Sequence, residues 1–319
     1  MSATASERAT EGAPERSSRA RVPWLETRKL GIVARFELAE ALRSRLVVVV
    51  LSLYGAGAAL GSWLFIRALE AAERAVRGPL EAQLNAHAVP SEDVQRQAVS
   101  QVLSLLIDDT TLLADLAAAD PLALFYGFMA LQLVAPFVLL TSAGAHATDV
   151  SRGTTRFLLT RCERLTWALG KTLAHATLLA LGLLLSALAA ATVGFWQGQL
   201  GAASVGWLAR AAARALFYGV AFLGIFGGVA LAIPSPARAR AASVLVLMGC
   251  WLGHALSQAG WVASLVPGVH VLSWVFPGQY QELLWSPSWL VSGAAALALC
   301  GLGGLAFAAG QLRFRGADA

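Results

Sequence analysis

Residues 173–195 read LAHATLLALGLLLSALAAATVGF, a stretch without a single Asp, Glu, Lys or Arg. The hydrocarbon core of a bilayer is about 30 Å thick and needs about 20 apolar residues in one helix. Five more uncharged segments meet this requirement, at residues 46–66, 122–142, 215–233, 242–263 and 289–310. The sequence therefore predicts an all-α, polytopic integral membrane protein with six transmembrane helices. The end of the fifth helix is the least defined, because residues 259–277 stay apolar but contain Gly and Pro.

The composition of the whole chain agrees with these segments. Of its 319 residues 57% are hydrophobic and only 13% are charged, and its mean hydropathy is +0.63. Soluble domains carry about 25% charged residues. These values exclude a disordered chain, a disulfide scaffold and an ordinary soluble enzyme. The net charge of +5 could suggest nucleic-acid binding, but the cations are distributed as expected for the loops between membrane spans.

The cations also predict the orientation of the chain. Eighteen of the 24 Lys and Arg residues precede the first span, follow the last, or lie between the second and third or the fourth and fifth. Cytoplasmic loops of membrane proteins carry such an excess. We therefore expect a multi-pass protein of the bacterial cytoplasmic (inner) membrane with both termini in the cytoplasm.

The predicted domain organisation places four segments around and within the spans. Residues 1–27 are expected to be a disordered cytoplasmic tail, and residues 311–319 a short cytoplasmic C-terminal tail. Residues 28–45 resemble an interfacial amphipathic helix whose apolar face is interrupted by Glu37, or simply a basic stop before the first span. In the six-span transmembrane domain, 46–310, residues 67–121 are a helical outer loop that Pro79 is expected to break. This loop contacts a substrate or an outer partner, or serves only as a connecting lid.

The segment 144–171 reads GAHATDVSRGTTRFLLTRCERLTWALGK and lies on the predicted cytoplasmic side. Large apolar residues alternate there with Arg and Glu, which an exposed loop does not require. A helix that docks its apolar face on a partner or on the membrane surface does require them.

No catalytic or metal site is predicted. Gly170-Lys171-Thr172 resembles the end of a phosphate-binding loop, but Leu165 stands where that motif needs a glycine. The five histidines are scattered, and no two have the i, i+4 spacing of a helical metal site. An intramembrane enzyme needs a paired nucleophile and base, and Ser257 has only His254 nearby.

Three polar residues within the spans, Gln132, His254 and Gln258, could line a substrate path or form interhelical hydrogen bonds. No charged residue lies deep in a span, which argues against a proton- or sodium-coupled carrier. Such a protein needs an energy source outside the membrane.

Two glycine pairs have the spacing that permits close helix contact. They are Gly57 with Gly61, and Gly249 with Gly253. In a chain this rich in Gly and Ala they are weak evidence for a dimer face.

The cytoplasmic segment resembles a known family, the permease subunits of type-2 ABC (ATP-binding cassette) exporters. The likeness lies in an acidic residue followed by Gly-Thr, Leu-Leu, an Arg and a Gly-Lys that opens the third span. It extends to the six-span layout, the large outer loop and the ending Gly310-Gln-Leu-Arg-Phe-Arg315. In this sequence the coupling residues that the resemblance implies are Asp149, Arg152, Gly153, Thr154, Arg156, Phe157, Leu158, Leu159, Arg164, Gly170 and Lys171.

The resemblance implies a transport subunit that is not itself an enzyme and works by alternating access. It implies a separate cytoplasmic ABC ATPase subunit, which would bind ATP and Mg, and a second permease copy, identical or different. The chain itself is expected to hold no cofactor, and its other partner is membrane lipid. The alternative is a non-transporting membrane scaffold that recruits another cytoplasmic protein. The sequence does not identify the transported substrate.

Overall fold

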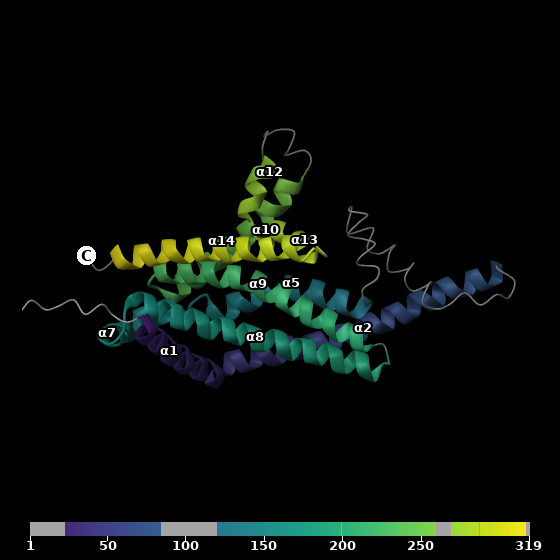
Figure 1. Ribbon diagram of the computed structural model, residues 1–319, viewed down its shortest axis with the longest axis horizontal. Coiled ribbons are helices and arrows are strands. Elements are labelled where there is room, and N and C mark those ends of the chain that lie inside the picture. Colours follow the sequence, from purple (N-terminus) through teal and green to yellow (C-terminus); the bar gives the residue numbers. More distant parts are fainter. Residues whose placement is uncertain (1–22, 84–119, 199, 260–268, 287, 317–319) are drawn as a thin grey trace, which may run out of the picture.

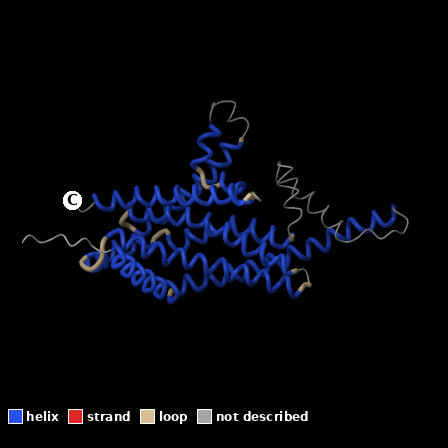
Figure 2. The backbone as a smooth tube through the Cα atoms, viewed as in Figure 1, coloured by secondary structure: helices blue, strands red, loops and turns tan. Residues whose placement is uncertain are grey.

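The computed structural model describes residues 23–83, 120–198, 200–259, 269–286 and 288–316, and every regular element among them is a helix (Figure 2). Six of these helices are long and apolar enough to cross a membrane. They confirm the predicted all-α fold with six such helices. Most of the predicted tail 1–27 and of the predicted outer loop 67–121 lies outside the described residues.

Each of the six long helices extends past its predicted span at one end or at both. They are α2 (Arg45–Gln83), α5 (Pro121–Ser142), α8 (Arg164–Trp196), α9 (Ala202–Ala232), α10 (Pro236–Gln258) and α14 (Trp289–Gly316). Shorter elements are α1 (Pro23–Arg43), α6 (Ala145–Arg152), α7 (Thr154–Leu159), α12 (Val269–Leu272), the 3₁₀ turn η1 (Ser273–Val275) and α13 (Gln279–Trp285).

The observed helix ends differ from the predicted boundaries at several positions. Helix α2 continues through Pro79 to Gln83, and α1 already begins at Pro23, inside the predicted tail. Helix α10 ends at Gln258 rather than residue 263, and α14 continues to Gly316, through most of the predicted C-terminal tail. Apolar composition sets only the part of a helix that lipid requires, and a helix continues wherever its neighbours permit it.

Helix α9 is the centre of the bundle. It lies between α5 and α14, while α8 packs against α1, α2 and α9 (Figure 1). In α9, 72% of the most apolar stretch is buried, whereas only 17% of the corresponding stretch is buried in α2 and in α10. The carboxy-terminal part of α10 projects to one side of the bundle together with α12 (Figure 1). Helices α2 and α10 therefore leave most of their apolar surface to lipid or to a partner.

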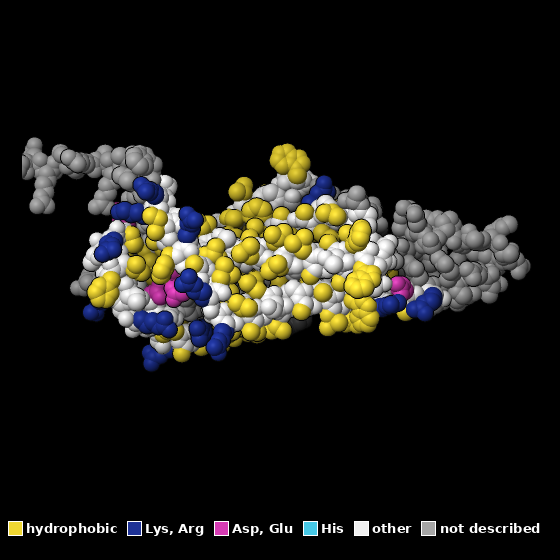
Figure 3. All heavy atoms as spheres, turned by 90° about the horizontal axis from the view of Figure 1, so that it is seen from below, with side chains coloured by type: hydrophobic (Ala, Val, Ile, Leu, Met, Phe, Trp, Pro, Cys, Tyr) yellow, Lys and Arg dark blue, Asp and Glu magenta, His cyan; other side chains and the backbone are white. Residues whose placement is uncertain are grey.

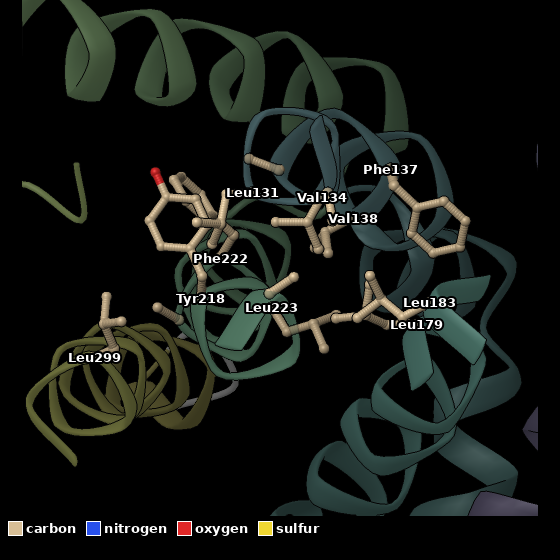
Figure 4. Packing of buried hydrophobic residues seen from close by; sticks show 14 of the residues in the cluster. Leu131, Val134, Phe137, Val138, Leu179, Leu183, Tyr218, Phe222, Leu223 and Leu299 are labelled. Carbon is tan, nitrogen blue, oxygen red and sulfur yellow. The ribbon is translucent and has the colours of Figure 1, made fainter. Parts of the chain in front are cut away.

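The main core forms where α5, α8 and α9 meet (Figure 4). It contains Val134 and Val138 of α5, Leu179 of α8 and Phe222 of α9, and all four side chains are buried. Leu299 of α14 joins the same cluster. Burial of each such side chain stabilises the fold by about 1.5–3 kcal/mol when water is the alternative. Within a bilayer the gain comes instead from close packing.

Helices α9 and α14 approach closely because glycines line their contact. A Cβ atom on Gly310 would lie 2.2 Å from the Gly228 carbonyl oxygen, and one on Gly224 would lie 2.3 Å from that of Gly303. Such distances are impossible for any side chain. The small residues thus set the distance between the two helices.

Candidate functional site

Lys and Arg side chains gather at one end of the bundle, which we call the basic end. It is formed by α1, α6, α7 and the carboxy-terminal part of α14 (Figures 1 and 3). Apolar side chains cover the middle of the face seen in Figure 3. The opposite end, where α9 and α14 begin, is called the far end.

Lys171 fastens three helices together at the basic end. Its Nζ donates to Asp149 Oδ2 of α6 at 2.5 Å and lies 3.0 Å from Glu37 Oε2 of α1. Lys171 itself belongs to α8 and is only 5% exposed. A buried ammonium group needs such partners, because removing a charge from water costs several kcal/mol.

The contact between α1 and α8 explains the neighbouring glycine. A Cβ atom on Gly170 would lie 2.8 Å from the Val33 side chain and 3.2 Å from the Leu30 carbonyl oxygen. Glycine at this position lets α1 lie close enough for Glu37 to reach Lys171. Burial raises the pKa of Glu37 above its ordinary value, and this effect outweighs the opposing effect of the nearby Lys171.

A left-handed turn separates α6 from α7. Gly153 has φ +72°, a conformation that residues with a Cβ atom rarely adopt. Thr154 Oγ1 donates to the Asp149 carbonyl oxygen at 3.0 Å across this turn. The sequence thus folds locally into two short helices joined at a fixed angle.

Helix α7 has an inner and an outer side. Leu158 packs against the cluster around the fully buried Trp167, and the Cys162 thiol donates to the Leu158 carbonyl oxygen at 3.3 Å. Phe157 points away and is 80% exposed, and Arg152 and Arg156 are exposed as well. An exposed phenyl ring next to exposed arginine side chains is the kind of surface that binds a partner.

A groove of about 740 Å³ runs beside α7. Its lining includes Leu159 of α7, Arg161 from the α7–α8 connection, Lys29 of α1 and Arg315 of α14. Arg164 also lines it and places its guanidinium group 5.5 Å from the centre of the Phe314 ring. The groove would suit a partner with acidic side chains.

The predicted coupling residues thus divide into two groups. Phe157, Arg152 and Arg156 face outward, and Leu159 and Arg164 line the groove. Asp149, Gly153, Thr154, Leu158, Gly170 and Lys171 instead hold the local structure together.

Sequence reasoning missed the role of Glu37 as the partner of Lys171. Its signal was present, because a carboxylate interrupts the apolar face of the helix 28–45. A charge on a buried face requires a buried partner.

The three polar residues of the predicted substrate path do not form one group. Gln258 Nε2 of α10 donates to Gln279 Oε1 of α13 at 2.8 Å, and His254 lies against Gly278. Gln132 lies on α5, and no hydrogen bond within the described part of the chain connects it to the other two.

The fold and this end of the molecule define a helical, multi-pass membrane protein with a basic end. A search against known protein families finds no match to the chain, and a search of curated proteins finds none either.

Proposed function

We propose that this chain is the membrane-spanning permease subunit of an ABC exporter, energised by a separate ATPase subunit that docks on α7. The observation that supports this most directly is the exposed Phe157 beside the exposed Arg156, on a short helix whose inner side is packed. In this proposal the basic end is cytoplasmic, following the positive-inside rule. The chain lies in the bacterial inner membrane with a second permease copy beside it.

The packing beneath α7 supplies a route for transmitting motion. Helix α6 is joined to α8 and α1 through Lys171, so a displacement of α6 would move all three helices together. ATP binding and hydrolysis on the partner would then favour inward- or outward-facing arrangements in turn. The substrate would be exported by this alternation.

Helix α1 fits an interfacial position in the same proposal. Ile32 and Phe36 are exposed on the side of α1 away from α8, 61% and 66% respectively. Apolar side chains on that side would enter the boundary between headgroups and acyl chains. Lipid would then hold α1 while α8 moves against it.

Two substitutions on α7 test the docking. Phe157→Asp and Arg156→Glu change only exposed side chains, so the protein should fold and reach the membrane. We expect each to lower ATPase binding by at least tenfold and to abolish ATP hydrolysis stimulated by the permease in reconstituted vesicles.

A matched change elsewhere controls for general effects of charge. Arg238→Glu in the first turn of α10 should leave ATPase binding unchanged. If binding survives both substitutions on α7, docking at this surface is wrong. A purified native complex without an ATPase, and vesicles without transport, would instead favour the membrane scaffold.

A further inference from the structure

A second basic site lies at the far end of the bundle. There α9 and α14, with α13 beside them, enclose a groove of about 800 Å³. Arg210 and Arg214 line it from α9, and Trp289 and Ser292 from the first turn of α14. Its volume is within the range of about 300–1,000 Å³ that is usual for sites of small molecules.

Arg214 is not satisfied by the protein around it. Its guanidinium group lies 5.2 Å from the centre of the Trp285 ring, and its Nη1 atom is buried without a hydrogen-bond partner. Neither Arg210 nor Arg214 forms an ion pair with a carboxylate of the described residues. A buried guanidinium donor without an acceptor is costly, and an anion would remove that cost.

The two arginines reinforce each other. They are four residues apart and therefore share one side of α9. Arg210 places its guanidinium group 5.4 Å from the centre of the Trp207 ring. Two adjacent cations of the same sign repel each other unless an anion lies between them, and a phosphate offers acceptors to both.

The rest of the groove is apolar. Both helices run from the far end toward the basic end, so Phe217 of α9 and Leu297 and Cys300 of α14 lie deeper than the arginines. The groove is thus polar at its mouth and apolar along its length. That gradient matches an amphiphile and not a free inorganic ion.

The depth of the site agrees with this reading. Trp289 lines the groove, and Trp207 and Trp285 lie against the guanidinium groups of Arg210 and Arg214. Tryptophan favours the headgroup zone of a bilayer. The arginines therefore lie at the level of lipid phosphates.

We propose that this groove is a binding site for an anionic phospholipid. Its phosphate lies on Arg210 and Arg214, and one acyl chain follows Phe217, Leu297 and Cys300. A net negative headgroup is preferred because a zwitterionic lipid would bring its own cation next to the two arginines. The site needs only a bilayer around the chain, and it does not depend on an ATPase partner.

The test uses the full chain, purified in detergent and stripped of lipid. Phosphatidylglycerol, phosphatidylcholine and inorganic phosphate are each titrated while the melting temperature is followed. We expect a saturable rise with phosphatidylglycerol, with at least tenfold weaker half-saturation for phosphatidylcholine and no rise with phosphate alone. In the variant Arg210→Gln/Arg214→Gln the two lipids should act alike. Arg74→Gln, a cation of α2 outside the groove, should retain the preference.

Native mass spectrometry of the unmodified protein gives a second measurement, which stands even if the double variant fails to fold. Phosphatidylglycerol should remain bound at collision energies that release phosphatidylcholine. Equal retention of the two lipids would overturn the proposal, as would a preference that persists in the double variant. A full thermal shift with inorganic phosphate would show an anion site that does not select a lipid, and would overturn it too.

Discussion

Lys171 is the residue on which the basic end depends most. It neutralises two carboxylates, Glu37 and Asp149, on two other helices. Lys171→Met would leave these two partly buried carboxylates without their shared cation. We expect a loss of about 3–5 kcal/mol in stability, because breaking a buried pair leaves an uncompensated charge. Thermal unfolding in detergent measures it.

A matched substitution separates this effect from a general loss of charge. Arg152→Met removes an exposed cation of α6 and should change the melting temperature little. Adding Glu37→Gln and Asp149→Asn to Lys171→Met should restore much of the stability. A Lys171→Met variant as stable as the parent would refute the role assigned to this residue.

Glu37 should behave differently from Lys171, and its effect should depend on pH. Burial raises its pKa, so the folded state holds the proton more tightly than the unfolded state does. The contribution of such a group to stability falls as the pH rises from the ordinary carboxyl value through the raised one. Glu37→Gln stays neutral, so the variant should gain stability relative to the parent as the pH rises above the ordinary carboxyl range.

Melting temperatures of both proteins across this range check the sign. Glu40→Gln, on the exposed side of the same helix, is the control and should not reproduce the trend. If the melting temperature of the parent rose relative to that of Glu37→Gln as the pH rises, the expected direction would be contradicted.

Sequence patterns identified this region at the residue scale but not each residue's task. The alternation of Arg with Phe and Leu singled out 144–171, and the docking role of this segment stays a prediction. Yet Gly170 and Lys171 lie inside the contact with α1, which no local pattern reveals. A residue's partner 134 positions away in the chain, as Glu37 is from Lys171, becomes visible only in the fold.

At the scale of elements, the contact between α9 and α14 makes a sharp prediction. A Cβ atom on Gly303 would lie 2.8 Å from the Ala221 carbonyl oxygen, whereas one on its neighbour Gly304 would meet nothing within 4 Å. Gly303→Val should therefore push the two helices apart and cost about 1–3 kcal/mol or more. Gly304→Val is the matched control, since it adds the same atoms one position away. Thermal unfolding and the monodisperse fraction in size-exclusion chromatography measure both, and equal effects would disprove the close contact.

The elements show which part of a membrane fold is readable in advance. Six spans followed from length and hydropathy alone, because lipid imposes one requirement on each of them. The close contact between α9 and α14 could not be predicted in this way. Glycine spacing drew attention to Gly57 and Gly249, but a Cβ atom on either would meet nothing within 4 Å. Gly224, Gly228, Gly303 and Gly310 make the contact instead, and only the arrangement of helices distinguishes them from the other glycines.

At the scale of the whole molecule, our proposals assign ATPase docking to one end of the bundle and lipid binding to the other. The basic end carries α7 and the groove beside it, and the far end carries the arginines of the α9–α14 groove. Docking of an ATPase requires that the basic end faces the cytoplasm, whereas the lipid site does not depend on the orientation. The side of the membrane on which α7 lies is therefore the measurement with the widest consequence.

Single cysteines at the two ends decide the orientation. In a background without Cys162, Cys250 and Cys300, Phe157→Cys marks the basic end and Trp196→Cys, at an 87% exposed position that ends α8, marks the far end. A thiol reagent that cannot cross the membrane should label Trp196→Cys in intact cells, but label Phe157→Cys only after permeabilisation. Both positions are highly exposed, so a difference between them reports the membrane and not burial. Labelling of Phe157→Cys in intact cells would place α7 outside, where no ATPase could reach it, and the proposed function would then be wrong while the lipid site could still be tested.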